Sequence, residues 1–291
     1  MHNHQLTHPA AATQAETAPG PILVVGATGK TGRRVAARLQ ALGLPVRAGS
    51  RGADRPFDWE DPATWATALA GTSAAYIAFA PDLAVPGAPA AIDAFARTAL
   101  DAGCRRLVLL SGRGEPEAQA AERVLQESGA DWTVVRCSWF CQNFDESVFR
   151  EPLLGGVLAL PVAPDVREPF VDADDIADVA VAALSQDGHA GRVYELTGPR
   201  LLTFAEAVGE VARACGRDLE FVPITLDAFA AGLAADGTPA EVIALLGYLF
   251  TEVLDGRNAS LADGVQRALG RPPRDFADYA QAAAAAGPWD V

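Results

Sequence analysis

Three glycines at a spacing of three residues, Gly26, Gly29 and Gly32, form the pattern with the clearest chemical meaning in this sequence. They lie between a β-branched run at 22–25 and a segment at 33–42 whose apolar residues recur at helical spacing. Glycines in such a unit let the backbone approach a pyrophosphate, whose charge is stabilised by free N–H groups at the helix N-terminus. We therefore predict a dinucleotide-binding turn. Its expected cofactor contacts are Gly26, Thr28, Gly29, Lys30, Thr31 and Gly32.

The turn differs from the ATP-binding loop G-x-x-x-x-G-K-[ST], although Gly29-Lys30-Thr31 matches the last three positions of that loop. The loop requires a glycine five residues before Gly29, and this chain has Val24 there. The spacing therefore favours a nicotinamide dinucleotide over ATP.

The residue that distinguishes NAD from NADP is expected at the end of the second strand, about 20 residues after the turn. The segment there is Gly49-Ser50-Arg51, and no carboxylate follows before Asp54. A guanidinium offers a planar set of donors that suits a ribose 2′-phosphate, so we predict NADPH/NADP+ with contacts from Ser50 and Arg51. A solvated surface arginine is the alternative.

Strands and helices alternate along most of the chain, which predicts an α/β fold of the Rossmann type with a doubly wound parallel sheet. The expected strands are 22–25, 45–48, 57–59, 74–79, 106–110, 132–135, 192–196 and 219–222. The expected helices are 33–42, 62–69, 88–102, 117–128, 174–184, 204–215, 226–234 and 240–254. We expect a disordered tail at 1–20, an NADP-binding domain at 21–197 and a smaller, mostly helical substrate lobe at 198–291. Residues 146–170 of the NADP-binding domain are expected to contribute to that substrate lobe.

Ligands of open α/β sheets bind at the carboxyl ends of the strands, so residues just after the predicted strands are candidates for the site. The further cofactor contacts expected there are Ala78, Phe79, Ala80, Ser111 and Ser138, with Asp58 and Trp59 beside the adenine. Ordinary packing by Trp59 and a helix-capping role for Ser111 are the alternatives. The expected substrate contacts are Pro81, Arg113, Trp139, Phe140, Asn143, Phe144 and Phe170.

Several segments together resemble the NmrA-like, atypical short-chain dehydrogenases over roughly residues 21–280. They are the glycine turn, Gly49-Ser50-Arg51, Leu109-Leu110-Ser111 and the stretches 135–144, 169–177, 198–203 and 270–276. With Phe57-Asp58-Trp59-Glu60-Asp61 included, the pattern is most similar to the ergot-alkaloid agroclavine and festuclavine dehydrogenases. That resemblance implies reduction of an iminium carbon by NADPH.

The tyrosine–lysine pair with which many short-chain dehydrogenases protonate a carbonyl oxygen is missing, because Lys30 in the glycine turn is the chain's single lysine. An iminium carbon is already cationic and needs no general acid, only positioning and a favourable field. Carboxylates near the site would stabilise the bound cation, and the candidates are Glu115, Asp145 and Asp172. Each has a solvated surface carboxylate as its alternative.

The net charge of −14 argues against nucleic acid or an anionic membrane as a partner, because phosphate groups demand basic surfaces. Four dispersed cysteines, and His189 as the only histidine beyond residue 20, favour buried thiols over a metal site or disulfides. Without a signal peptide or an apolar span, we expect a cytoplasmic protein. The oligomeric state is left open.

The sequence thus favours an NADPH-dependent reductase acting on an imine, an iminium ion or a conjugated C=C bond of a small apolar metabolite. Because the catalytic pair is missing, a non-catalytic NADP(H)-binding redox sensor of the NmrA type is the main alternative. An epimerase or a quinone or azo reductase on the same scaffold is a third reading.

Overall fold

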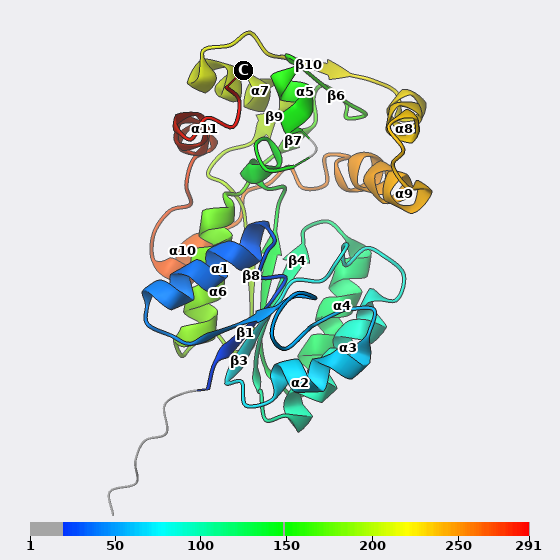
Figure 1. The fold of residues 1–291 in the computed structure, drawn as a ribbon. Helices are drawn as coiled ribbons and strands as arrows, with labels where there is room; N and C mark the ends of the chain where they lie inside the picture. Colours follow the sequence, from blue (N-terminus) through cyan, green and yellow to red (C-terminus); the bar gives the residue numbers. More distant parts are fainter. Residues whose placement is uncertain (1–19, 148, 291) are drawn as a thin grey trace, which may run out of the picture.

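The computed structural model describes residues 20–147 and 149–290. In these ranges a parallel sheet of six strands has the order β2-β1-β3-β4-β5-β8, which confirms the Rossmann-type fold (Figure 1). The strands are β1 Ile22–Val25, β2 Val46–Gly49, β3 Ala74–Ile77, β4 Arg106–Gly112, β5 Asp131–Cys137 and β8 Arg192–Leu196. The order turns at β1, which lies between β2 and β3, so the carboxyl ends of β1 and β3 flank the crevice where such sheets bind ligands.

Helices cover both faces of the sheet, which explains why β1 is apolar at every position. Ile22 and Val24 pack into one cluster, with α1 (Lys30–Ala41), α6 (Ala173–Ser185) and α10 (Gly264–Leu269). Leu23 and Val25 pack into the other, with α2 (Trp65–Leu69), α3 (Ala88–Asp101) and α4 (Pro116–Glu127). Figure 1 shows these two helical layers on opposite sides of the strands.

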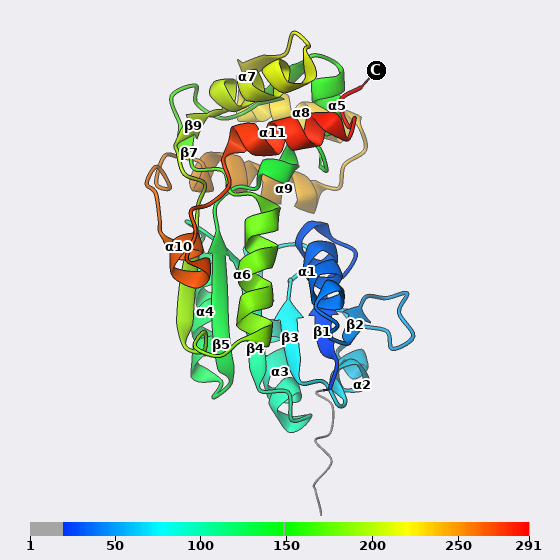
Figure 2. The ribbon, with the colours of Figure 1, turned by 90° about the vertical axis from the view of Figure 1, so that its left-hand side faces the viewer.

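A smaller and mostly helical lobe lies beyond the carboxyl ends of the strands (Figure 2). Its helices are α5 Arg150–Leu154, α7 Phe204–Cys215, α8 Leu226–Ala235, α9 Ala240–Tyr248 and α11 Phe276–Ala285. Short strand pairs complete it: β6 Val157–Leu160 with β10 Glu220–Pro223, and β7 Arg167–Glu168 with β9 Leu202–Thr203. Aromatic side chains dominate its core, so the lobe has a hydrophobic cluster of its own.

The chain returns from the lobe to the sheet before it ends. Helix α10 packs on β8 and α6, and the segment that follows it carries Arg271 and Arg274. Both guanidinium groups pair with Asp175, which is fully buried on α6. The two lobes are therefore connected by charge pairs as well as by the backbone.

One predicted strand was wrong. Residues 57–59 form a turn, in which Asp58 bridges to Asp61 and its Oδ1 accepts the N–H of Glu60 at 3.1 Å. Phe57 is buried, but it packs against Trp65 and Phe95 instead of pairing in the sheet. The β-propensity of this segment reflects burial in an aromatic cluster rather than strand pairing.

Other differences concern the ends of elements. The helix expected at 62–69 begins with a 3₁₀ turn at Pro62–Thr64, and the helix expected at 240–254 changes to a π-helical turn at Leu249–Val253. Strand β4 extends through Gly112, and the pairs formed by β6, β7 and β9 were not predicted. Apart from Gly20, the tail expected at 1–20 lies outside the described residues.

Within the described residues no helix is both long enough and apolar enough to cross a membrane. All four cysteines are free thiols, and Cys104, Cys137 and Cys141 are buried. In the same part of the chain, no group of three or more His, Cys, Asp and Glu side chains is arranged to hold a metal ion.

Candidate active site

The glycine turn is tight because backbone atoms occupy the space that side chains would need. A Cβ on Gly32 would lie 2.1 Å from the carbonyl oxygen of Gly26, and Gly26 itself has a φ of 72°, in the left-handed region. Helix α1 begins directly after Gly29, with no capping side chain and no acidic residue in its first turn. Its N-terminal N–H groups therefore suit a phosphate group, and these residues fit a dinucleotide.

Ser50 and Arg51 follow β2, next to the glycine turn, since the N–H of Gly26 donates to the carbonyl of Gly49 at 3.0 Å. Arg51 is exposed and forms no ion pair within residues 20–147 and 149–290. Its guanidinium is thus free to bind an anion beside the glycine turn. The indole N–H of Trp59 donates to the carbonyl of Ala78 at 3.2 Å, and its ring packs on Phe79.

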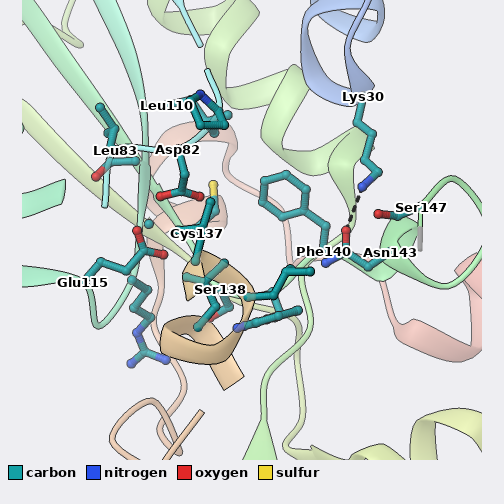
Figure 3. A pocket seen from close by; sticks show the side chains of 18 of the residues that line it. Lys30, Asp82, Leu83, Leu110, Glu115, Cys137, Ser138, Phe140, Asn143 and Ser147 are labelled. Carbon is teal, nitrogen blue, oxygen red and sulfur yellow. Dashed lines mark hydrogen bonds between the residues drawn. The ribbon is translucent and has the colours of Figure 1, made fainter. Parts of the chain in front are cut away.

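A cavity of about 410 Å³ opens at the carboxyl edge of the sheet, beneath the smaller lobe. Its walls come from the ends of β3, β4 and β5, from the start of α1, and from α9 and the π-helical turn (Figure 3). Of the residues predicted for the site, those lining it are Lys30, Phe79, Pro81, Ser111, Arg113, Glu115, Ser138, Trp139, Phe140 and Asn143. The cavity thus joins the end of the glycine turn to a mostly apolar chamber.

Two predicted substrate contacts lie elsewhere. Phe144 and Phe170 are buried in the core of the smaller lobe, where their ring centroids are 5.5 Å apart, and neither lines the cavity. Both rings also pack against Phe204 and Phe276. The prediction was wrong because the lobe needs these rings for its own core.

Two of the three candidate carboxylates also lie outside the cavity lining. Asp145 accepts the hydroxyl of Tyr279 at 2.7 Å, and burial raises the pKa of its carboxyl. Asp172 is the N-cap of α6, where it accepts the N–H of Asp174 at 2.8 Å and the side-chain amide of Gln142 at 2.8 Å. Their roles in the structure are hydrogen bonding and helix capping.

Ser111 and Arg113 line the cavity, but their polar groups are bound to the protein. The Ser111 hydroxyl donates to Glu122 at 2.6 Å from within β4, so the helix-capping alternative was wrong. The Arg113 guanidinium donates to Glu195 at 2.6 Å and to the carbonyls of Asn258 and Ser260 at 2.8 Å each. Arg113 therefore fixes the segment at 258–260 to the end of β4 and has little capacity left for a substrate.

Lys30 is the cationic group on the other side of the cavity. Its Nζ donates to Oδ1 of Asn143 at 2.8 Å, and burial lowers the pKa of its ammonium group against the raising effect of Glu146 and Asp145 (Figure 3). No tyrosine is among the described residues that line the cavity. The site therefore has no tyrosine–lysine pair in space, as in sequence.

Asp82 was not predicted for the site, and it lies in the wall of the cavity beside Glu115 (Figure 3). Burial and the neighbouring charge of Asp82 together raise the pKa of Glu115 to about 8. Burial also raises the pKa of Asp82, while the N–H of Ala84 at 2.8 Å opposes that shift. Asp82 directly follows Pro81, a predicted contact after β3, and a carboxylate at that position is the signal from which it could have been predicted.

A family model described as NAD(P)H-binding matches residues 26–187. The chain belongs to this NAD(P)H-binding family. The chain is similar to the NAD(P)H azoreductase of Xenophilus azovorans, with 31% identity over 91% of this chain and 98% of the relative. The agroclavine dehydrogenase of Claviceps fusiformis is 31% identical over 89% of this chain and 95% of the relative.

The fold of this NAD(P)H-binding protein is also that of NmrA, a negative transcriptional regulator solved in complex with NAD. The TM-score is 0.67 at 17% identity, over 91% of this chain and 95% of NmrA. The resemblance to NmrA-like proteins and to agroclavine dehydrogenases is thus confirmed. Together with the family match, these relatives make the chain an NAD(P)H-dependent oxidoreductase.

Proposed function

We propose that this oxidoreductase uses NADPH to reduce an imine, an iminium ion or a conjugated C=C bond in a small, largely apolar metabolite. The observation that carries the proposal is the cavity of about 410 Å³, which continues from the end of the glycine turn and has aromatic and aliphatic walls. A volume of this size is within the range of small-molecule sites. The names of the agroclavine dehydrogenase and of the azoreductase support a nitrogen-containing acceptor.

When bound, the cofactor supplies a hydride. The N–H groups at the start of α1 hold its pyrophosphate, and Arg51 binds the 2′-phosphate, which favours NADPH over NADH. Trp139, Phe140 and Leu249 surround the substrate and exclude water from the reacting carbon. An iminium ion needs no further acid, which agrees with the lack of a tyrosine among the described lining residues.

The cavity also favours an enzyme over a non-catalytic redox sensor of the NmrA type. A sensor has to bind a dinucleotide and a protein partner, and neither task requires a chamber for a second small molecule. Here the chamber lies at the carboxyl edge of the sheet and includes buried polar groups from several strand ends.

The test is NADPH oxidation, followed by absorbance, across cyclic imines, N-alkyl iminium salts and cyclic enones. We expect turnover of at least one class, with a higher kcat/KM for NADPH than for NADH. Tight NADPH binding without oxidation by any acceptor in the panel would instead support the sensor.

A further inference from the structure

The lining of the cavity contains a pair of carboxyl groups, Asp82 and Glu115. Asp82 lies in the segment after β3, and Glu115 is the residue directly before α4. Both line the cavity, and their carboxyl groups lie beside each other (Figure 3), close enough for the charge of Asp82 to raise the pKa of Glu115. Neither carboxyl group forms an ion pair in the part of the chain that the structure describes.

Two carboxylates this close and this buried do not both ionise at neutral pH, because the second negative charge is repelled by the first. Asp82 ionises more readily than Glu115, since its carboxylate accepts the N–H of Ala84 at 2.8 Å. Among the described residues no backbone N–H donates to the carboxyl group of Glu115, which packs on Gly112; the residue is 9% exposed. The shared proton therefore resides on Glu115, in agreement with a pKa of about 8 for that group.

Charged and titratable neighbours do not neutralise the pair. Each of the nearest acidic neighbours has its own partner: Glu122 binds Arg136, and Glu117 accepts the hydroxyl of Tyr248 at 2.6 Å.

The basic neighbours are also paired, Arg113 with Glu195 at 2.6 Å and Arg257 with Asp255 at 2.8 Å. Cys137, whose pKa burial raises, faces Glu115 as a neutral thiol. The pair thus keeps one proton and one negative charge that are available to a ligand.

We infer that the Asp82–Glu115 pair is the proton donor of this site, and that it protonates the nitrogen of a neutral imine as the hydride reaches the imine carbon. This role rests on the proposed function. The C=N π bond breaks, the carbon takes the hydride, and the nitrogen takes the proton from the Glu115 hydroxyl, while the cofactor is oxidised to NADP+. Water then restores the proton through the partly exposed Asp82. Donation leaves both carboxyl groups ionised, and the N–H of the neutral amine donates to the Glu115 carboxylate until water returns the proton to the pair.

Two substrates separate proton donation from charge stabilisation: a neutral cyclic imine and its N-methylated iminium salt, which takes hydride without a proton. Glu115→Gln leaves Asp82 ionised, so the pair keeps its single negative charge and loses its proton. We expect the ratio of kcat for the imine to kcat for the iminium salt to fall by about 100-fold, the usual contribution of a general acid. A ratio that does not change in Glu115→Gln overturns the proposal, as does a wild-type enzyme that reduces only the iminium salt.

The matched control is Glu151→Gln, which changes an exposed carboxylate on α5 that does not line the cavity. Its kcat ratio should equal that of the wild type. Thermal unfolding and NADPH affinity of both variants show that the fold and the cofactor cradle are intact.

Infrared difference spectra give a readout that does not depend on turnover. With NADP+ bound at pH 7, the wild type should show the C=O stretch of a protonated carboxyl group that is absent in Glu115→Gln and is lost as the pH rises past about 8. If that band is missing, the shared proton is refuted even when the enzyme is active. If neither substrate is reduced although the band is present, the proposed function itself is wrong, and the donor role with it.

Discussion

At the scale of the residue, Arg51 carries the predicted preference for NADPH. It is exposed, follows β2 and forms no ion pair in the described ranges. Charge-assisted hydrogen bonds contribute roughly 1.5–3 kcal/mol, so Arg51→Ala should weaken NADPH binding by roughly 10- to 100-fold and leave NADH binding nearly constant. Titration with each nucleotide measures both constants.

Arg97→Ala is the control for that change, since Arg97 is an exposed arginine on α3 that pairs with Asp93. It should leave both dissociation constants at their wild-type values. Equal losses of NADPH and NADH affinity in Arg51→Ala would show that Arg51 does not bind the 2′-phosphate.

Individual site residues were predictable where a strand end and a residue type coincided. Glu115, Phe79 and Trp139 were found in this way, and all line the cavity. Phe144 was misplaced because its residue type suits a pocket wall and a core equally, and only the packing of the lobe decides between them.

At the scale of the element, the close packing of the glycine turn gives a prediction for Gly32→Ala. The new Cβ would lie 2.1 Å from the carbonyl oxygen of Gly26, a backbone atom that cannot move away cheaply. We expect a loss of about 1–3 kcal/mol in the free energy of unfolding, and strongly weakened NADPH binding, because α1 shifts away from β1. Denaturant unfolding and nucleotide titration measure the two effects.

The control is Gly232→Ala in α8, where a Cβ would meet no atom within 4 Å. Alanine has the higher helix propensity, so this variant should be slightly more stable than the wild type and bind NADPH equally well. If Gly32→Ala bound NADPH as the wild type does, the turn would not be the pyrophosphate cradle.

Helices α8 and α9 are expected to be the least stable elements of the smaller lobe. No residue of α8 is buried, whereas most residues of α6 are. Amide hydrogens of α8 and α9 should therefore exchange faster than those of α6. Because Leu245 and Leu246 line the cavity, a bound substrate analogue should slow exchange in α9. If the analogue did not change the rate of amide hydrogen exchange in α9, the substrate would bind elsewhere.

The sheet was predictable because each βαβ unit is local in sequence and its strands are apolar on both faces. The pairing of β6 with β10 was not, since it joins two segments far apart in the chain and no turn signal connects them. The segment at 57–59 was wrongly predicted as a strand for another reason: Phe57 is buried by contacts with Trp65 and Phe95 rather than by neighbouring strands.

At the scale of the whole molecule, buried carboxyl groups link stability to pH. Burial raises the pKa of Glu168, which is 1% exposed, to about 7. The unfolded chain loses this proton above pH 4.5 while the folded chain keeps it to about pH 7, so the group lowers stability as pH rises through that window. Over the window this amounts to about 3 kcal/mol.

Glu168→Gln removes that titration and can still accept the N–H of Trp139, which now donates to Glu168 at 3.2 Å. We expect urea unfolding to show that, from pH 5 to pH 8, the free energy of unfolding of the wild type falls by about 3 kcal/mol more than that of this variant. The exposed Glu60→Gln should follow the wild type. An equal pH dependence in Glu168→Gln and the wild type would contradict the raised pKa of this carboxyl group.

The central claim, that hydride passes from NADPH to a carbon in the cavity, is tested most directly with NADPH carrying deuterium at C4. In a single turnover with a cyclic imine, we predict one deuterium per product, on the carbon that was double-bonded to nitrogen. Bound labelled NADPH that transfers no deuterium to any imine, iminium salt or enone would contradict the account.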